Sequence, residues 1–280
     1  MSLEALDFRG QPALRVALPG GDSCTVALHG AQLLSWITAD GLERLYLSPG
    51  ARFDGRSAIR GGVPICWPQF NQRGPLPKHG FARNLPWRLD GPDSGQAPGS
   101  LTLALVSDAA TRAIWPHDFQ ARLALTLAPD ALRIALTIDN SGDAPWPFTA
   151  ALHSYLRVDD VSAVRLEGLQ GAPRWDSLRD LRSVESASTP VFGNEFDSVY
   201  GAPAAPLRLV QPSATLAISA SASCTETVVW NPGPVLAAKL DDMPDDGWRH
   251  MLCVEAACID APVLLAPGAQ WQAWQNLTVL

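Results

Sequence analysis

The feature of this chain that most constrains its fold is the alternation of apolar and polar side chains, which recurs along most of the sequence. It is clearest in residues 121–127 and 132–138, which read Ala-Arg-Leu-Ala-Leu-Thr-Leu and Leu-Arg-Ile-Ala-Leu-Thr-Ile. Because successive side chains of a β-strand point to opposite faces of a sheet, such runs predict half-buried strands. Pro129 and Asp130 between them predict a turn, so the two runs are expected to form a β-hairpin.

Similar patterning predicts further strands, whereas no long stretch has helical periodicity. These strands are expected at residues 14–18, 25–28, 33–38, 44–47, 101–105, 162–166, 207–210, 215–219, 227–230, 251–255 and 273–279. The 24 prolines and 22 glycines supply frequent turns. We therefore predict an all-β fold, a large antiparallel β-sandwich. No charged or low-complexity linker divides the chain, so a single domain is expected over residues 1–280.

Composition excludes several classes of partner. The net charge is −7 and Lys and Arg together number only 21, so no broad basic face for a nucleic-acid backbone is expected. The longest uncharged stretch, residues 261–280, contains prolines and glutamines and does not match a membrane helix. The acidic residues near the N-terminus do not resemble a secretory signal. Five cysteines without a Cys-x-x-Cys pair predict reduced thiols, a cytoplasmic protein and no zinc site.

Two polar residues interrupt apolar runs. Glu255 lies within residues 252–259 and His153 within residues 147–156. A buried unpaired charge costs several kcal/mol, so such groups are either matched by a structural partner or held for proton transfer. The structural alternatives are a backbone carbonyl bonded to the histidine and an arginine paired with the glutamate. A His and a Glu together are the usual parts of a general acid and base pair, which we predict here.

Residues 59–70 and 77–84 combine two arginines, a lysine and a histidine with glycines and prolines. Glycine permits close approach of the backbone and proline stiffens a loop, so these loops are suited to holding polar groups around a ligand. Both runs resemble the hexose-6-phosphate mutarotases, also called glucose-6-phosphate 1-epimerases, of the aldose 1-epimerase superfamily. The resemblance continues in family order through Leu-His-Ser-Tyr-Leu at 152–156, Phe-Asp-Ser-Val-Tyr at 196–200, Val-Val-Trp-Asn-Pro at 228–232 and Cys-Val-Glu-Ala-Ala at 253–257.

The resemblance implies a galactose mutarotase-like supersandwich with an open cleft, in which His153 is the general acid and Glu255 the general base. Interconversion of α and β anomers requires loss of the anomeric hydroxyl proton and protonation of the ring oxygen, then rotation about C1–C2 and closure. Two groups positioned on opposite sides of the C1–O5 bond suffice for this chemistry. Neither a metal nor an organic cofactor is expected, in agreement with the missing Gly-x-Gly-x-x-Gly and His-Glu-x-x-His motifs.

The resemblance also implies a set of substrate-binding residues. Arg60 and Arg83 match phosphate-binding arginines, and a guanidinium suits a phosphate dianion. Asp197 matches a residue that contacts sugar hydroxyls. The remaining expected contacts are Lys78, His79 and Gln69. Trp67 and Trp230 are the candidates for stacking on a sugar ring, and the loop at residues 176–196 is expected to border the cleft.

The predicted protein is a monomeric enzyme acting on a small sugar phosphate. Each binding residue also has a structural alternative: ion pairs within the fold for the two arginines, bracing of a loop for Lys78 and His79, and turn capping for Asp197. Two other functions remain open. A mutarotase for neutral aldoses would use the same acid and base without the arginines, and a carbohydrate-binding or regulatory module would retain the cleft without turnover. The sequence leaves the preferred hexose and the pathway open.

Overall fold

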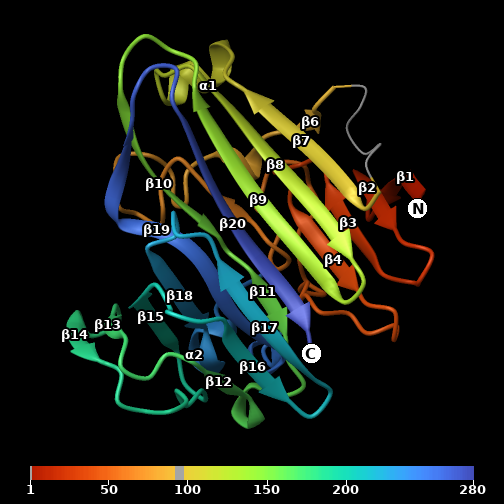
Figure 1. The fold of residues 1–280 in the computed structure, drawn as a ribbon, viewed down its shortest axis with the longest axis vertical. Coiled ribbons are helices and arrows are strands. Elements are labelled where there is room, and N and C mark those ends of the chain that lie inside the picture. The colour runs from red at the N-terminus through yellow and green to blue at the C-terminus, as the bar shows by residue number, and fades with distance from the viewer. Residues whose placement is uncertain (1, 92–97) are drawn as a thin grey trace.

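The computed structural model describes residues 2–91 and 98–280, which form three antiparallel sheets (Figure 1). The first, in spatial order, consists of β1 (Ser2–Phe8), β2 (Gln11–Ala17), β3 (Ser23–Ala27) and β4 (Leu33–Ile37). The second has the order β14 (Leu181–Val184), β13 (Pro173–Asp176), β15 (Phe196–Gly201), β18 (Glu226–Asn231), β19 (Met251–Leu265), β10 (Trp146–Leu152) and β5 (Ile65–Cys66), with β11 (Tyr155–Arg157) also paired to β19.

The third sheet has the order β12 (Arg165–Glu167), β16 (Leu207–Gln211), β17 (Ala214–Ala220), β20 (Gln270–Val279), β9 (Ala131–Asn140), β8 (Phe119–Ala128), β7 (Ser100–Val106) and β6 (Arg88–Leu89). Helical structure is limited to short segments: α1 (Ala109–Ile114), α2 (Gly233–Ala237) and the 3-10 turns η1 (Ala82–Asn84), η2 (Val161–Ala163) and η3 (Gly247–His250). Within the described residues, none of these helices has the length and apolar character needed to cross a membrane.

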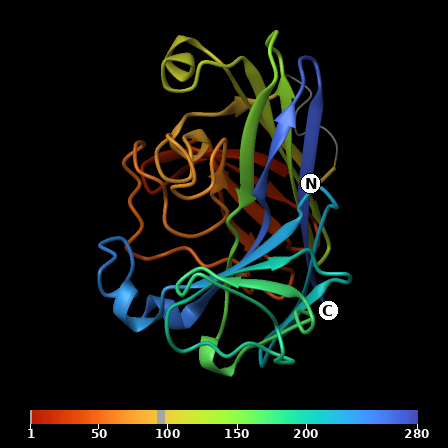
Figure 2. The ribbon, with the colours of Figure 1, turned by 90° about the vertical axis from the view of Figure 1, so that its left-hand side faces the viewer.

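The predicted hairpin is confirmed. β8 and β9 pair from Phe119 with Asn140 down to Ala128 with Ala131, and their buried residues alternate with more exposed ones. Pro129 and Asp130 form the connection, in which Asp130 has a φ of 54°. The alternating runs thus became the long strands of the third sheet, which lie along one side of the molecule (Figure 2).

Three other strand predictions need correction. Residues 44–47 form only two isolated bridges, from Leu45 to Leu156 and from Leu47 to Gly61, and no continuous strand. Residues 162–166 begin as the turn η2, and only the last two belong to a strand. The strand predicted at 251–255 continues to Leu265, since β19 pairs with β10, β11 and β18 along its length.

The core lies where the inner faces of the sheets meet. Trp67 is completely buried there and packs edge-on against an aromatic group that comprises Phe81, Trp115, Phe119, Trp146 and Phe148. Trp67 is therefore a core residue and cannot stack on a sugar, contrary to the prediction. The packing of Trp67 anchors the loop of residues 67–83 to the core. This loop lies on the opposite side of the molecule from the outer faces of β8, β9 and β20 (Figure 2).

Candidate active site

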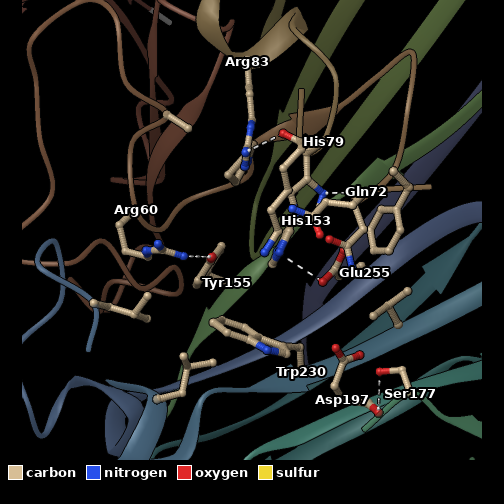
Figure 3. A pocket seen from close by; sticks show the side chains of 18 of the residues that line it. Arg60, Gln72, His79, Arg83, His153, Tyr155, Ser177, Asp197, Trp230 and Glu255 are labelled. Carbon is tan, nitrogen blue, oxygen red and sulfur yellow. Dashed lines mark hydrogen bonds and ion pairs between the residues drawn. The ribbon is translucent and has the colours of Figure 1, made fainter. Parts of the chain in front are cut away.

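A pocket of about 720 Å³ lies on the outer face of the second sheet. Its floor comes from strands β15, β18 and β19 and the β10–β11 junction, and its rim from the loops at 57–64, 70–83 and 175–178. The segment at 176–196 does border it, as predicted, through Ser177, Leu178 and Glu195. Figure 3 shows Arg60 and Arg83 on one side of this pocket and Asp197 on the other, with His153 and Glu255 between them.

The register of the sheet brings His153 and Glu255 together. Leu152 pairs with Ala256 and Tyr155 with Cys253, so His153 stands directly opposite Glu255 although the two are far apart in sequence. Directly opposed residues of an antiparallel pair share a face and have neighbouring Cβ atoms. His153 Nδ1 lies 3.2 Å from Glu255 Oε1. The two groups are thus side by side at the pocket.

Two buried polar residues, Ser154 and Gln275, hold the β10–β11 junction from the core side. Ser154 points away from the pocket, and its hydroxyl donates to Gln275 Oε1 at 2.5 Å. The Gln275 amide donates in turn to the Val254 carbonyl at 2.9 Å. Both side chains are essentially inaccessible to solvent, so these hydrogen bonds are made in a medium where their loss is costly. They hold the backbone on which His153 is mounted.

Neither member of the pair has the structural partner that would explain its burial. His153 is 8% and Glu255 1% exposed. Nδ1 of His153 and Oε2 of Glu255 accept or donate no hydrogen bond among the described residues, and no arginine there pairs with Glu255. The two structural alternatives, a histidine hydrogen-bonded to a backbone carbonyl and a glutamate paired with an arginine, are therefore not supported. Unsatisfied buried groups at a pocket wall are suited to meet a ligand.

Rings surround His153 and fix its orientation. The Tyr155 ring stacks on it at 4.8 Å and 9°, and Trp230 meets it edge-on at 5.9 Å. His79 meets it at 5.5 Å. The backbone N–H of Asn71 donates to His79 Nδ1 at 3.2 Å, so the neutral His79 ring carries its proton on Nε2. Burial, and then His153, lower the pKa of His79 far below its ordinary value, which keeps that ring a neutral donor.

Burial acts on both members of the pair in the direction that opposes charge. It raises the pKa of Glu255 well above the ordinary 4.5, and the neighbouring Asp197 carboxylate raises it further. It lowers the pKa of His153 well below the ordinary 6.5, and the positive charges of Arg83 and Arg60 lower it further. Burial therefore favours the neutral form of both side chains.

The two arginines differ in their surroundings. Arg60 Nε lies 3.1 Å from the Asp242 carboxylate, and its Nη1 donates to the Tyr155 hydroxyl at 3.2 Å. Arg83 has no carboxylate partner among the described residues. Its Nη2 donates to the Lys78 carbonyl at 3.0 Å, while its buried Nε has no partner. Arg83 thus carries an uncompensated charge toward the pocket, whereas Arg60 is partly neutralised by Asp242.

Glycines let the rim loops approach the sheets closely enough to place these groups. Gly62, two residues after Arg60, has a φ of 61°, and a Cβ there would lie 2.0 Å from the Leu33 carbonyl oxygen. Gly80 has a φ of 70°, and its Cβ would lie 2.2 Å from the Trp67 carbonyl oxygen. Any other residue would push the loop outward. The glycines therefore set the distance between the arginines and the floor.

Asp197 occupies the acidic side of the pocket. It lies on β15 opposite Trp230, and burial raises its pKa above the ordinary value. Arg73 is placed nearby, with its guanidinium 4.6 Å from the Trp175 ring centroid. Arg60 and Arg83 thus lie on one side of the pocket, and Asp197 lies on the other with Arg73 near it. A ligand with an anionic end and several hydroxyl groups matches this distribution.

Comparison with known proteins agrees with this geometry. Residues 14–278 match the protein family described as Aldose 1-epimerase. The chain belongs to this family. A candidate glucose-6-phosphate 1-epimerase from Cenchrus ciliaris is 35% identical over 272 residues, which cover 92% of this chain and 82% of the relative.

Solved structures of aldose 1-epimerase relatives confirm the predicted fold. A candidate mutarotase from Salmonella typhimurium has a TM-score of 0.89 at 33% identity, over 99% of this chain and 93% of that one. A galactose mutarotase-related enzyme from Lactobacillus acidophilus, 14% identical with a TM-score of 0.75 over 100% and 97% of the two chains, shares the fold. The large antiparallel β-sandwich of the galactose mutarotase-like type is therefore correct.

In this aldose 1-epimerase family member, most predicted site residues meet at one pocket. His153, Glu255, Arg60, Arg83, Lys78, His79 and Asp197 all line it, as does Trp230. Gln69 does not. Its amide donates to the carbonyls of Asn71 and Leu76 and accepts from the Leu76 N–H, so it closes the loop beneath the pocket. Sequence reasoning missed Tyr155 and Asp242, although Tyr155 follows His153 at the two-residue spacing that places both on one face of a strand.

Proposed function

We propose that this protein is a cofactor-independent mutarotase that interconverts the α and β anomers of hexose 6-phosphates, with glucose 6-phosphate as its substrate. The observation that supports it most directly is the contact of 3.2 Å between His153 Nδ1 and Glu255 Oε1 at the wall of a pocket. The ring oxygen and the anomeric hydroxyl of a pyranose are both bonded to C1. Two proton-transfer groups in mutual contact can therefore reach both oxygens of one sugar.

The proton of the pair supplies both halves of the reaction. Transfer from the Glu255 carboxyl group to His153 converts the neutral pair into a carboxylate and an imidazolium. The carboxylate then takes the anomeric hydroxyl proton while the imidazolium protonates the ring oxygen, and the ring opens to the aldehyde. Rotation about C1–C2 and the reverse transfers close the ring on the other face. The sum of protons on the pair is unchanged, so no other acid or base is required.

A phosphate at C6 fits the positive side of the pocket. C6 is bonded to C5, which is bonded to the ring oxygen. A sugar whose ring oxygen meets His153 can therefore direct its phosphate toward Arg83 and Arg60. The dianion also offsets the arginine charges that lower the pKa of His153. Phosphate binding therefore favours the imidazolium form that the reaction needs. A neutral hexose makes neither contribution, so the arginines favour a phosphorylated substrate over a neutral one.

The direct test is to measure anomer exchange by NMR for glucose 6-phosphate and for glucose. We expect the wild-type protein to accelerate both exchanges, with a much higher kcat/KM for the phosphorylated sugar. Equal values would contradict the choice of substrate and favour a neutral-aldose mutarotase. Absence of acceleration for either sugar, with sugar phosphate binding retained in calorimetry, would instead support a non-catalytic carbohydrate-binding module.

The pH dependence of kcat/KM should show a broad plateau. The active free enzyme holds one proton on the pair. On the acid side, activity is lost when His153 takes up a second proton, and the lowered pKa of His153 places this limb below pH 6.5. On the alkaline side, activity is lost when Glu255 ionises, and the raised pKa of Glu255 places this limb well above pH 4.5. The plateau should therefore begin below pH 6.5 and end well above pH 4.5.

Glucose is the better substrate for this pH profile, because the second ionisation of a phosphate group falls near pH 6 and would add a limb of its own. The spontaneous exchange rate at each pH is subtracted. An acid limb above pH 6.5, or an alkaline limb at or below pH 4.5, would contradict the assignment of a neutral, one-proton pair.

A further inference from the structure

Cys253 places a third potential metal ligand beside the acid and base pair. It precedes Glu255 by two residues on β19 and therefore shares its face of the sheet, opposite Tyr155. One ligand atom from each of His153, Cys253 and Glu255 lies within 4.8 Å of the other two. Cys253 is completely buried, and it packs with Tyr155 and Met251 beneath the pocket wall. The proton transfers described above do not use its thiol.

We propose that His153, Cys253 and Glu255 form a binding site for a thiophilic divalent metal ion of the zinc class, and that an ion bound there inhibits the enzyme. Imidazole nitrogen, thiolate sulfur and carboxylate oxygen are the ligands that Zn²⁺ prefers. A tetrahedral zinc centre places its nitrogen and oxygen ligands about 3.4 Å apart. The separation of 3.2 Å between His153 Nδ1 and Glu255 Oε1 already approaches that value.

The unsatisfied hydrogen-bonding capacity of the site is an independent indication of a ligand. Nδ1 of His153 and Oε2 of Glu255 are both buried without a partner among the described residues. Both residues also line the pocket, which gives an ion a route from solvent. Three protein ligands leave a fourth coordination position open for water. The soft thiolate distinguishes this site from the oxygen sites that bind Mg²⁺ or Ca²⁺, so those ions should not compete.

The inhibition follows from the proposed function, because a metal ion on His153 and Glu255 occupies the electron pairs that exchange protons with the sugar. The ion and the substrate therefore exclude one another. We expect Zn²⁺ to inhibit anomer exchange of glucose 6-phosphate, chelation with EDTA to restore it, and a rising substrate concentration to weaken the inhibition. Mg²⁺ at the same concentration should have no effect.

Direct binding is measured with Cd²⁺, whose bond to a thiolate produces an ultraviolet charge-transfer band. We expect one Cd²⁺ per wild-type chain with this band. Cys253→Ser should abolish the band and weaken Cd²⁺ and Zn²⁺ binding by about 100-fold, in the range of losses produced by altering metal-site residues. Cys66→Ser is the matched control. Cys66 is also completely buried, and it pairs with Ala151 on the same face of the sheet, one row away from the site.

The proposal is overturned if Cys253→Ser binds Cd²⁺ as tightly as the wild type, or if Cys66→Ser rather than Cys253→Ser abolishes the band. Cys253→Ala provides a second variant should the serine side chain prevent folding, which circular dichroism would reveal. Because the band requires no turnover, binding through Cys253 by a protein inactive on sugars would refute the mutarotase and leave the metal site standing. An active enzyme that gives no band and is insensitive to Zn²⁺ would refute the metal site and leave the mutarotase standing.

Discussion

Replacement of Glu255 by Gln is expected to lower kcat for anomer exchange of glucose 6-phosphate by about 10²–10⁴-fold, the usual contribution of one proton-transfer group. The amide fills the same space but cannot take the hydroxyl proton. His153→Asn should have an effect of similar size. The double variant should be hardly worse than either single one, because the two residues act as a unit in which each proton transfer requires the other. NMR exchange spectroscopy at equilibrium measures all three variants against the spontaneous rate.

Glu226→Gln is the matched control for this experiment. Glu226 lies on the adjacent strand β18, is 9% exposed and accepts hydrogen bonds from the backbone N–H groups of Ile259 and Asp260. It does not line the pocket. We expect its replacement to reduce stability while leaving kcat within about twofold, as befits a buried carboxylate with a structural task. Full activity in Glu255→Gln would remove the acid and base assignment altogether.

The sequence indicated His153 and Glu255 because each interrupts an apolar run, but it could not show that they touch. Their contact depends on the register between the β10–β11 strands and β19, which pairs residues about a hundred positions apart. β10 itself is buried on both faces along most of its length, so it lacks the alternation that revealed β8 and β9. The strand that ends just before His153 was therefore less visible than the hairpin remote from the pocket.

The loops show a different limit. Gln69 and Trp67 stand in the same run as Arg60, yet one closes a turn and the other enters the core. Residue type and position in a motif do not decide which way a side chain points, because that direction depends on the backbone of an irregular segment. The pairing of Arg60 with Asp242 was equally hidden, since their contact joins distant loops. The sequence did not predict that Cys253 lies close to His153 and Glu255, because the three residues form no local metal-binding motif.

Replacement of Arg83 by Met is expected to reduce kcat/KM for glucose 6-phosphate by roughly 30- to 150-fold and to leave the value for glucose nearly unchanged. The loss corresponds to about 2–3 kcal/mol, the range of a hydrogen bond to a charged group. Arg83 is suited to this test because no carboxylate among the described residues depends on it. Methionine retains most of the aliphatic volume, so stability in urea should change little.

Arg60→Met provides the informative contrast. Its loss removes a phosphate contact but also leaves the Asp242 carboxylate, which is 19% exposed, without its partner and with its negative charge close to the phosphate. This variant should therefore lose both stability and selectivity, whereas Arg83→Met loses selectivity alone. Arg112→Met, which breaks an exposed ion pair with Asp118 at α1, should alter neither. If Arg83→Met retained the wild-type preference for glucose 6-phosphate over glucose, the phosphate would have to bind elsewhere in the pocket, and the orientation proposed for the sugar would be wrong.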